Sequence, residues 1–496
     1  MAINGVSIGS NVLGQSARKL TDQLASLSTQ LTTGKKSTTY AGMGVNEGFA
    51  IAARSQLSNI SGFTDTMVKT NTTIGVANTA LQTMVSIGNQ TKTAAANTSQ
   101  TIGSNGQTLP QQTAISQFST MIGVLNTQSG DRYIFSGAAL TTPSVASAED
   151  ILNGKDAAAG LKQVIAERNA ADLGTAGLGR VVVTQPSTTS MSVAEDVAGS
   201  PFGLKLKAIT STLAGATVTG PTGSPAAVSV DLGASNPANG DKISLSFNLP
   251  DGTTESVTLT ASSVTPTPVG SFAIGATPDA TATNLNAAVT TAIGKLANTS
   301  LVAASALQAS DNFFDTPPQR VSGTPATATA LVDGTLTNTV QWYTGEAGAG
   351  PARATSTARI DQSIAVQFGA RANEDAIRNQ LQNIAAFAAV TVAPTGVNSG
   401  ATVAALSQRV SQNLSTRPGQ QSITDIQADL STAQVAMSDA KSRQTQTKTM
   451  LQGIVDQAEN VSTDEVATQI LALQTALSAS YQTTSMLSQL SLLKFL

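Results

Sequence analysis

Two residue types are missing from this chain of 496 residues: it contains no cysteine and no histidine. Without cysteine there can be no disulfide, no thiolate nucleophile and no thiolate metal ligand. Without histidine the chain lacks a common metal ligand and the side chain most often used as a general base. We therefore expect no catalytic residues, no metal site and no cofactor.

Charge is also scarce. Only 11% of the residues are charged, where about 25% is typical, and aromatic residues make up 3%. The formal net charge of −3 indicates neither the basic footprint of a nucleic-acid-binding protein nor an acidic tail, so no nucleic-acid partner is expected. Ala, Ser, Thr, Gln, Asn and Gly take the place of charged residues, and such side chains cost less to bury against another protein than charges do.

Long apolar runs are absent as well. The longest near-apolar stretch runs from Ile384 to Val392, far short of the roughly 20 residues that span a bilayer, so no membrane insertion is expected. The N-terminal sequence MAINGVSIGSNVLGQ has no basic region followed by an apolar region, which is the pattern of a secretory signal peptide. The chain is expected to be cytosolic, or exported by a route that needs no cleaved signal.

A leucine-rich stripe lies near the N-terminus. Its apolar residues follow one another at intervals of 4, 3, 4, 3 and 4, which predicts a helix with a coiled-coil-like face. These residues are Leu13, Ala17, Leu20, Leu24, Leu27 and Leu31. Gly34 predicts the C-terminal cap of this helix, because glycine readily adopts the conformation found there. A phosphate-binding loop at Gly34–Ser37 is the alternative, and it fails because Thr29 stands where that loop needs a glycine.

Two further helices are predicted on the N-terminal side. One is centred on Ile115–Leu125, and the other has an apolar face formed by Ile51, Leu57, Ile60, Met67, Ile74 and Leu81. The segment SGDRYIFSG that follows reads as a turn entering a short strand. In this segment Asp131 and Arg132 are interpreted as solvated turn residues rather than as an acid–base pair.

The C-terminal side mirrors the N-terminal side. Apolar spacing predicts a helix from Ile423 to about Val455. Ser462–Glu465 has the form of a capping box, in which the serine accepts from a backbone N–H and the glutamate reaches back. Helical spacing then continues almost to the end of the chain, through Val466, Ile470, Leu473, Leu477, Thr484, Leu487, Leu490 and Leu493.

The middle of the chain, from about Val181 to Pro351, is rich in Gly, Pro, Ala and Thr. The segment DKISLSFNLPDGTTESVTLT predicts a β-hairpin that turns at Asp251–Gly252, and ATNLNAAVTTAIGKLA predicts a helix. Trp342 and Tyr343 are interpreted as strand packing in this insertion rather than as a carbohydrate contact. The whole pattern predicts a mainly α fold, with long helices from both termini in a coiled-coil-like bundle and a β-rich (α+β) central insertion.

Both ends of the chain resemble the bacterial flagellin family, which includes filament flagellins and hook–filament junction proteins. The N-terminal LASLSTQLTTGKKSTTYAG is similar to the family's leucine-repeat helix and to the segment of LSTGKR type that follows it. The C-terminal LQTALSASYQTTSMLSQLSLLKFL is similar to the family's last helix. The resemblance covers about residues 1–170 and 360–496 and leaves the middle unaccounted for.

Two features within the family favour the junction type, the third hook-associated protein, over a filament flagellin. They are DRYIFSGA at Asp131–Ala138 and the ending LSLLKFL. The segment STTYAGMGVNEG departs from the family pattern, because it lacks the acidic pair that commonly follows the STG segment. The main filament-forming flagellin therefore stays open as the alternative.

The resemblance implies a structural protein of the extracellular flagellum. Family members are exported unfolded through the flagellum's own channel, with an export apparatus and an export chaperone as partners. They then polymerise with copies of themselves and with other axial proteins, namely hook-associated proteins and flagellin. Both termini pair in an inner tube, so the resemblance assigns inner-tube packing to the two apolar stripes, from Leu13 to Leu31 and from Val466 to Leu493.

The resemblance also implies five parts along the chain. The inner-tube domain takes residues 1–45 and the C-terminal helix 461–496. The helical rod takes 46–180 and 356–460, and a variable β-rich outer insertion takes 181–355.

Two other classes of function compete with this interpretation. Another secreted fibre or adhesin subunit predicts fibre repeats or a β-rich C-terminus, and the sequence has neither. An enzyme needs a convergent site, and the scattered carboxylates of a chain without His or Cys form none that we recognise. Spacing alone does not remove a catalytic serine or carboxylate pair, but we expect no enzyme.

Overall fold

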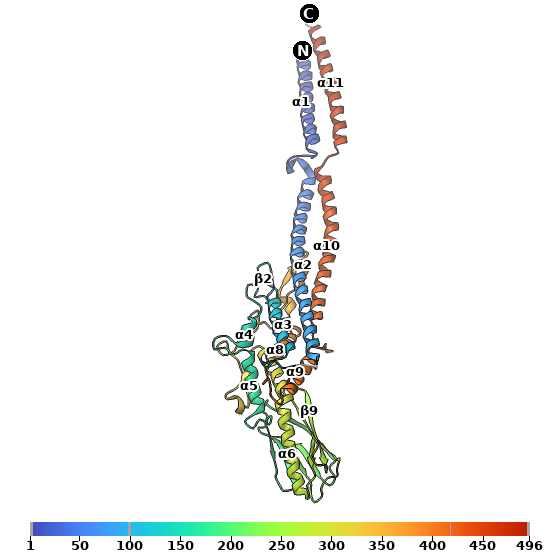
Figure 1. Ribbon diagram of the computed structural model, residues 1–496. Coiled ribbons are helices and arrows are strands. Elements are labelled where there is room, and N and C mark those ends of the chain that lie inside the picture. The colour runs from blue at the N-terminus through green and yellow to red at the C-terminus, as the bar shows by residue number, and fades with distance from the viewer. Residues whose placement is uncertain (1–2, 98–100, 417, 494–496) are drawn as a thin grey trace. The chain divides into compact units, whose positions relative to one another are not determined.

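The computed structural model describes residues 3–97, 101–416 and 418–493 (Figure 1). About 53% of the residues are helical and 16% lie in strands, with long helices at both ends of the chain and sheets in its central part. The prediction of a mainly α fold with a β-rich central insertion is therefore confirmed.

The chain divides into two units, and the first of them unites both ends of the sequence. Unit 1 consists of Met1–Thr70, Ala358–Val366 and Gln434–Leu496, and unit 2 of Asn71–Thr357 and Gln367–Ala433. Two long helices contribute residues to both units: α2 (Glu47–Ala96) and α10 (Ile423–Glu459). The five parts expected from the sequence remain a prediction.

Unit 1 is built mainly from helices that end where the sequence indicates. Helix α1 (Ile3–Thr33) is followed by Gly34, whose φ is +68° and whose N–H donates to the Gln30 carbonyl over 2.8 Å. This is the glycine cap that was predicted. The 3-10 helix η1 (Tyr40–Asn46) then leads into α2, and α11 (Thr463–Leu493) follows α10.

The apolar face predicted for α2 is mostly buried. The residues on this face that are buried or partly buried are Leu57, Ile60, Met67, Ile74 and Leu81. Ile51 departs from the prediction because it is exposed, whereas Ala50 and Ala53 are buried. The first turns of α2 therefore direct small alanines, and not Ile51, toward the neighbouring helix surface.

The helical part of unit 2 packs around alanine, leucine, phenylalanine and valine side chains. Besides the end of α2 it contains α3 (Leu109–Leu125), α4 (Ala148–Asn153), α5 (Leu161–Leu173), α7 (Val302–Phe313), α8 (Asp375–Ala389) and α9 (Ser399–Asn413). Two buried glutamines close the end of α8: Gln107 donates to the Ala388 carbonyl over 2.8 Å and Gln111 to the Val390 carbonyl over 2.9 Å. These two carbonyls lie at and just beyond the last turn of α8, where the helix itself supplies no N–H partner, so the glutamine amides take that place.

The insertion contains two four-stranded sheets. One has the strand order β3-β4-β7-β6 and the other β10-β9-β8-β5. Their strands are β3 (Val181–Thr184), β4 (Ser190–Glu195), β5 (Lys205–Ser211), β6 (Thr217–Thr222), β7 (Ala227–Asp231), β8 (Lys242–Asn248), β9 (Thr254–Ser262) and β10 (Ser271–Ala273). Helix α6 (Pro278–Leu296) contacts strands of both sheets and continues through the π-helical turn η2 (Ala297–Leu301) into α7.

The hairpin and the helix predicted in this insertion are both confirmed. Strands β8 and β9 are antiparallel with Leu245 opposite Val257, and Gly252 in the turn has a φ of +77°. The predicted apolar faces are buried in one core: Ile243, Leu245, Phe247 and Leu249 from the hairpin, and Leu285, Val289, Ile293 and Leu296 from α6. Alternation and helical spacing were therefore sufficient to find these two elements.

Short elements connect the longer ones. They are β1 (Gln128–Ser129), β2 (Arg132–Tyr133), β11 (Gln319–Val321), η3 (Pro325–Thr327), β12 (Leu331–Asp333), η4 (Ala352–Thr355), β13 (Thr357–Arg359) and β14 (Ala365–Gln367). Asp131 and Arg132 are exposed at the turn of the β1–β2 hairpin, as predicted. Trp342 is buried and donates to the Phe314 carbonyl over 3.0 Å, which confirms that it packs in the interior. Neither residue belongs to a strand, because Trp342 lies in a bend and Tyr343 makes a single bridge to Val145.

Candidate assembly surface of the terminal helices

Helices α1 and α11 lie side by side and run in opposite directions within unit 1 (Figure 1). The structure brings together eight of the residues predicted for the two apolar stripes. They are Ala17, Leu20, Leu24 and Leu27 on α1, and Val466, Ile470, Leu473 and Leu477 on α11. Among these eight, Val466 alone is fully buried, because two helices cannot surround one another's side chains.

The other residues predicted for the two stripes are either exposed or have side chains outside the described residues. Leu31 is 39% exposed, while its neighbour Gln30 is partly buried and donates to the Lys36 carbonyl over 3.0 Å. A straight helix drifts by about 20° per heptad from a 3.5-residue repeat, which is consistent with this rotation of Leu31 out of the stripe. Thr484 and Leu487 are exposed. The side chains of Leu13, Leu490 and Leu493 lie outside the described residues.

Exposed apolar side chains are concentrated in unit 1. It is the smaller unit, yet it holds thirteen of the twenty large apolar residues that are exposed in the described part of the chain. These thirteen are Val12, Leu31, Phe49, Ile51, Val68, Ile364, Val435, Met450, Ile454, Leu471, Tyr481, Met486 and Leu487. Exposed apolar residues gathered in this way are typical of a surface that another protein covers.

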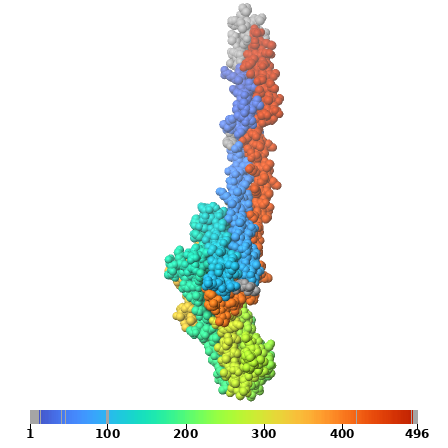
Figure 2. Space-filling view, in the orientation of Figure 1, coloured from blue at the N-terminus to red at the C-terminus, as the bar shows by residue number. Residues whose placement is uncertain are grey.

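Charge is scarce on α11. Helix α11 carries Asp464 and Glu465 in its first turn, and no charged residue follows them in the helix. Figure 2 shows the coloured parts of α1 and α11 in contact, with no other segment of unit 1 covering them on the face in view. Beyond its first turn, the uncovered face of α11 therefore presents Ser, Thr, Gln, Ala and Leu side chains, which can be buried without stranding a charge, whereas α1 exposes Arg18, Lys19 and Asp22.

The start of α11 is capped as the sequence indicates, but only in part. The Ser462 hydroxyl accepts from the Glu465 N–H over 3.4 Å. The Glu465 carboxylate accepts instead from Gln469 over 3.3 Å, one turn further along. The serine half of the predicted capping box is thus present, and the glutamate is used within the helix.

The neck, defined as residues 34–46 and 460–462, connects the two helix pairs of unit 1. A short antiparallel bridge joins these two segments: the Lys36 N–H donates to the Glu459 carbonyl over 2.7 Å, and the Val461 N–H donates to the Gly34 carbonyl over 3.0 Å. These bonds hold the end of α1 against the start of α11. The sequence patterns did not predict this bridge.

An ion pair supports the neck. Arg54 of α2 donates two hydrogen bonds of 2.7 Å to the Glu459 carboxylate at the end of α10. The Glu459 side chain is 5% exposed and that of Arg54 48%. The Arg54 guanidinium holds the pKa of the Glu459 carboxyl below its usual value, against the opposing effect of burial. Glu459 therefore stays ionised in the folded chain at neutral pH.

We expect Glu459→Gln to remove a pH-dependent part of the stability. A carboxyl with a lowered pKa stabilises the fold fully above its unfolded value, about 4.3, and loses this contribution as pH falls through the folded value. At pH 7 the variant should lose about 1–3 kcal/mol, because the ion pair is gone, and the difference from wild type should shrink steadily as the pH falls below about 4. Thermal unfolding followed by circular dichroism from pH 7 to pH 3 measures this. Asp456→Asn, which alters an exposed acid of the same helix, is the control and should keep the wild-type profile.

Among residues 3–97, 101–416 and 418–493, no group of three or more acidic side chains is arranged to hold a metal ion. No helix in this described part of the chain is long and apolar enough to cross a bilayer. Comparison with models of known protein families gives no match, and comparison with curated proteins gives none either.

Proposed function

We propose that the chain is a self-assembling structural subunit of the extracellular bacterial flagellum, of the hook–filament junction type. The observation that carries the proposal is the terminal helix pair, in which α1 and α11 pack along one stripe and leave apolar side chains exposed, with no charged residue on α11 beyond its first turn. The resemblance of both chain ends to the flagellin family supplies the flagellar context.

The helix pair has the spacing of a coiled-coil-like bundle. On α11 the residues turned toward α1 follow at intervals of 4, 3 and 4, from Val466 to Leu477. A pair of helices alone leaves most of each apolar surface in water, whereas several such pairs packed around an axis bury it. Copies of the same chain are therefore the occupants that complete the bundle.

The proposal includes further partners and a location. Other axial proteins, namely hook-associated proteins and flagellin, contact the assembly at its ends, and an export apparatus with a chaperone delivers the chain without a cleaved signal. The main filament flagellin is the alternative, since the same helix pair serves a long filament equally well. The ending LSLLKFL is the feature that favours the junction type.

Seeded assembly of the purified chain tests the proposal. Short rings or capped filament ends in electron micrographs support the junction type, whereas long filaments support the filament flagellin. A folded monomer that does not assemble, and whose terminal helices resist protease, contradicts both. Such a result would mean that the exposed apolar residues of unit 1 are not an assembly surface.

A further inference from the structure

A small pocket lies beneath the β1–β2 hairpin of unit 2, at the DRYIFSG segment. Its volume is about 270 Å³, and it is bounded by the hairpin on one side and by the segments around η4 and Phe368 on the other. This volume is slightly smaller than that of most small-molecule sites, which begin at about 300 Å³, so it suits a single sugar ring rather than a larger ligand.

The pocket has one charged group, and that group is free. Arg132 is the only charged side chain that lines it. Among the described residues, the Arg132 guanidinium, the Tyr133 phenol and the hydroxyls of Ser356 and Thr357 all lack a hydrogen-bond partner. Four residues with unpaired donors therefore line one space, and the only formal charge among its lining residues is positive.

The walls of the pocket are held by backbone hydrogen bonds. On the hairpin side, the Tyr133 N–H donates to the Leu140 carbonyl over 2.8 Å. On the opposite side, the Phe368 N–H donates to the Ser356 carbonyl over 2.9 Å and the Gly369 N–H to the Arg353 carbonyl over 3.0 Å. A Cβ atom at Gly369 would come within 2.1 Å of the Thr355 hydroxyl, so the segments that contain Gly369 and Thr355, both on this side of the pocket, pack directly against each other.

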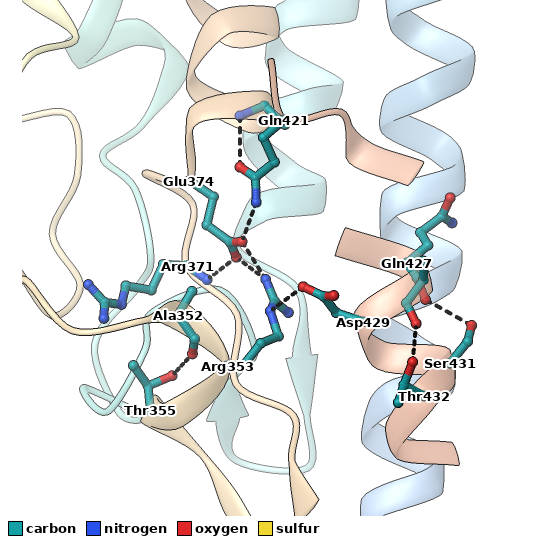
Figure 3. A network of polar contacts seen from close by, with 12 residues as sticks. Ala352, Arg353, Thr355, Arg371, Glu374, Gln421, Gln427, Asp429, Ser431 and Thr432 are labelled. Carbon is teal, nitrogen blue, oxygen red and sulfur yellow. Dashed lines mark hydrogen bonds and ion pairs between the residues drawn. The ribbon is translucent and has the colours of Figure 1, made fainter. Parts of the chain in front are cut away.

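A polar network anchors the second wall from behind. Figure 3 shows Thr355 beside Arg353, whose guanidinium donates to the Glu374 carboxylate and faces Asp429 of α10 at 3.7 Å. The Arg371 N–H also donates to Glu374, over 3.1 Å. The pocket is thus a preformed space with fixed walls.

We propose that this pocket binds an acidic monosaccharide, a sugar ring that carries a carboxylate. The planar fork of Arg132 matches a carboxylate with two parallel hydrogen bonds. Hydroxyl groups at Tyr133, Ser356 and Thr357 can each donate to and accept from the hydroxyls of a sugar. The rings of Tyr133 and Phe368 offer apolar surface for the C–H face of the same ring.

A carboxylate side chain from a second copy of the chain is the competing occupant. It would use Arg132 but leave the hydroxyls of Ser356 and Thr357 without a partner, so the lining favours the sugar. This inference goes beyond the proposed function and does not depend on assembly.

Titration of the full chain with D-glucuronate, followed by saturation-transfer NMR, tests the proposal. We expect saturable binding of glucuronate, and binding at least about tenfold weaker for glucose, which lacks the carboxylate, and for acetate, which lacks the ring. Arg132→Gln should weaken glucuronate binding about tenfold or more, and Arg132→Lys should restore part of it, because the charge returns without the fork.

Lys155→Gln is the matched control, since it removes an exposed positive charge of unit 2 that does not line the pocket. It should bind glucuronate as wild type does. Glucuronate binding that is absent, or equally tight in Arg132→Gln, overturns the proposal. Acetate binding as tight as that of glucuronate also overturns it, in favour of a carboxylate side chain from another copy.

Discussion

Leu487→Asp should abolish assembly of the chain while leaving the subunit folded. Leu487 is 50% exposed in the single chain, so a carboxylate there stays hydrated in the monomer. In the proposed assembly the same position is covered by neighbouring subunits, and an unpaired charge must be buried. A penalty of about 3 kcal/mol per subunit raises the critical concentration about a hundredfold. Sedimentation and electron microscopy measure the loss of polymer, and circular dichroism measures the fold.

Two further substitutions sharpen this test. Leu471→Asp, at a position 65% exposed on α11, should behave like Leu487→Asp. Leu336→Asp is the matched control, because Leu336 is 80% exposed in unit 2, and this variant should assemble normally. Leu24→Asp is less informative, since Leu24 is partly buried within the subunit and its loss also disturbs the contact with α11. Assembly of Leu487→Asp at the wild-type concentration would rule out this surface.

Local patterns were sufficient to predict the long helices at both ends of the chain, helix α6 and the β8–β9 hairpin. Gly34 ended α1, the Asp251–Gly252 turn closed the β8–β9 hairpin, and helical spacing identified the buried face of α6. Each of these depends on residues that lie within a few turns of one another, where conformational preference and burial act together. Ile51 was wrongly assigned to the buried face of α2, because spacing does not show which side of a helix end its neighbour covers, and there Ala50 and Ala53 are buried instead.

The long-range partners could not be predicted in this way. Arg54 and Glu459 are 405 residues apart in the sequence, and Gln107 lies 281 residues from the carbonyl of Ala388. Nothing in the local sequence of a charged or amide side chain indicates which distant backbone or carboxylate it meets. The order of strands in the two sheets could not be predicted for the same reason, since β5 pairs with β8 rather than with its neighbour in sequence.

The candidate assembly surface was predicted in part for the same reason. The two apolar stripes were recognisable from their spacing, and eight of their residues lie where α1 and α11 pack together. Thr484 and Leu487 continue the α11 spacing but remain exposed. Periodicity shows which residues share a helix face, but it does not show whether the same chain or another one covers that face.

Arg409→Ala should produce the largest loss of stability of any single change considered for unit 2. Arg409 of α9 is 6% exposed, and it bonds Asp251 of the β8–β9 turn over 2.9 Å and Glu255 of β9 over 3.0 Å. Asp251 is 8% exposed, so removal of the arginine leaves a buried carboxylate without its counter-charge. We expect a loss of about 3–5 kcal/mol in the free energy of unfolding. Urea unfolding followed by the fluorescence of Trp342, the only tryptophan, measures it.

A double variant separates the loss of the charge pair from the loss of packing. In Arg409→Met with Asp251→Asn both buried charges are gone, and we expect much of the lost stability to return, because no unpaired carboxylate remains. Arg443→Ala is the control: Arg443 is 53% exposed and faces Asp361 at 3.7 Å, so this variant should lose less than about 1 kcal/mol. If Arg409→Ala loses no more than Arg443→Ala, Arg409 does not tie the insertion to the helices, and apolar packing alone holds the β8–β9 turn against α9.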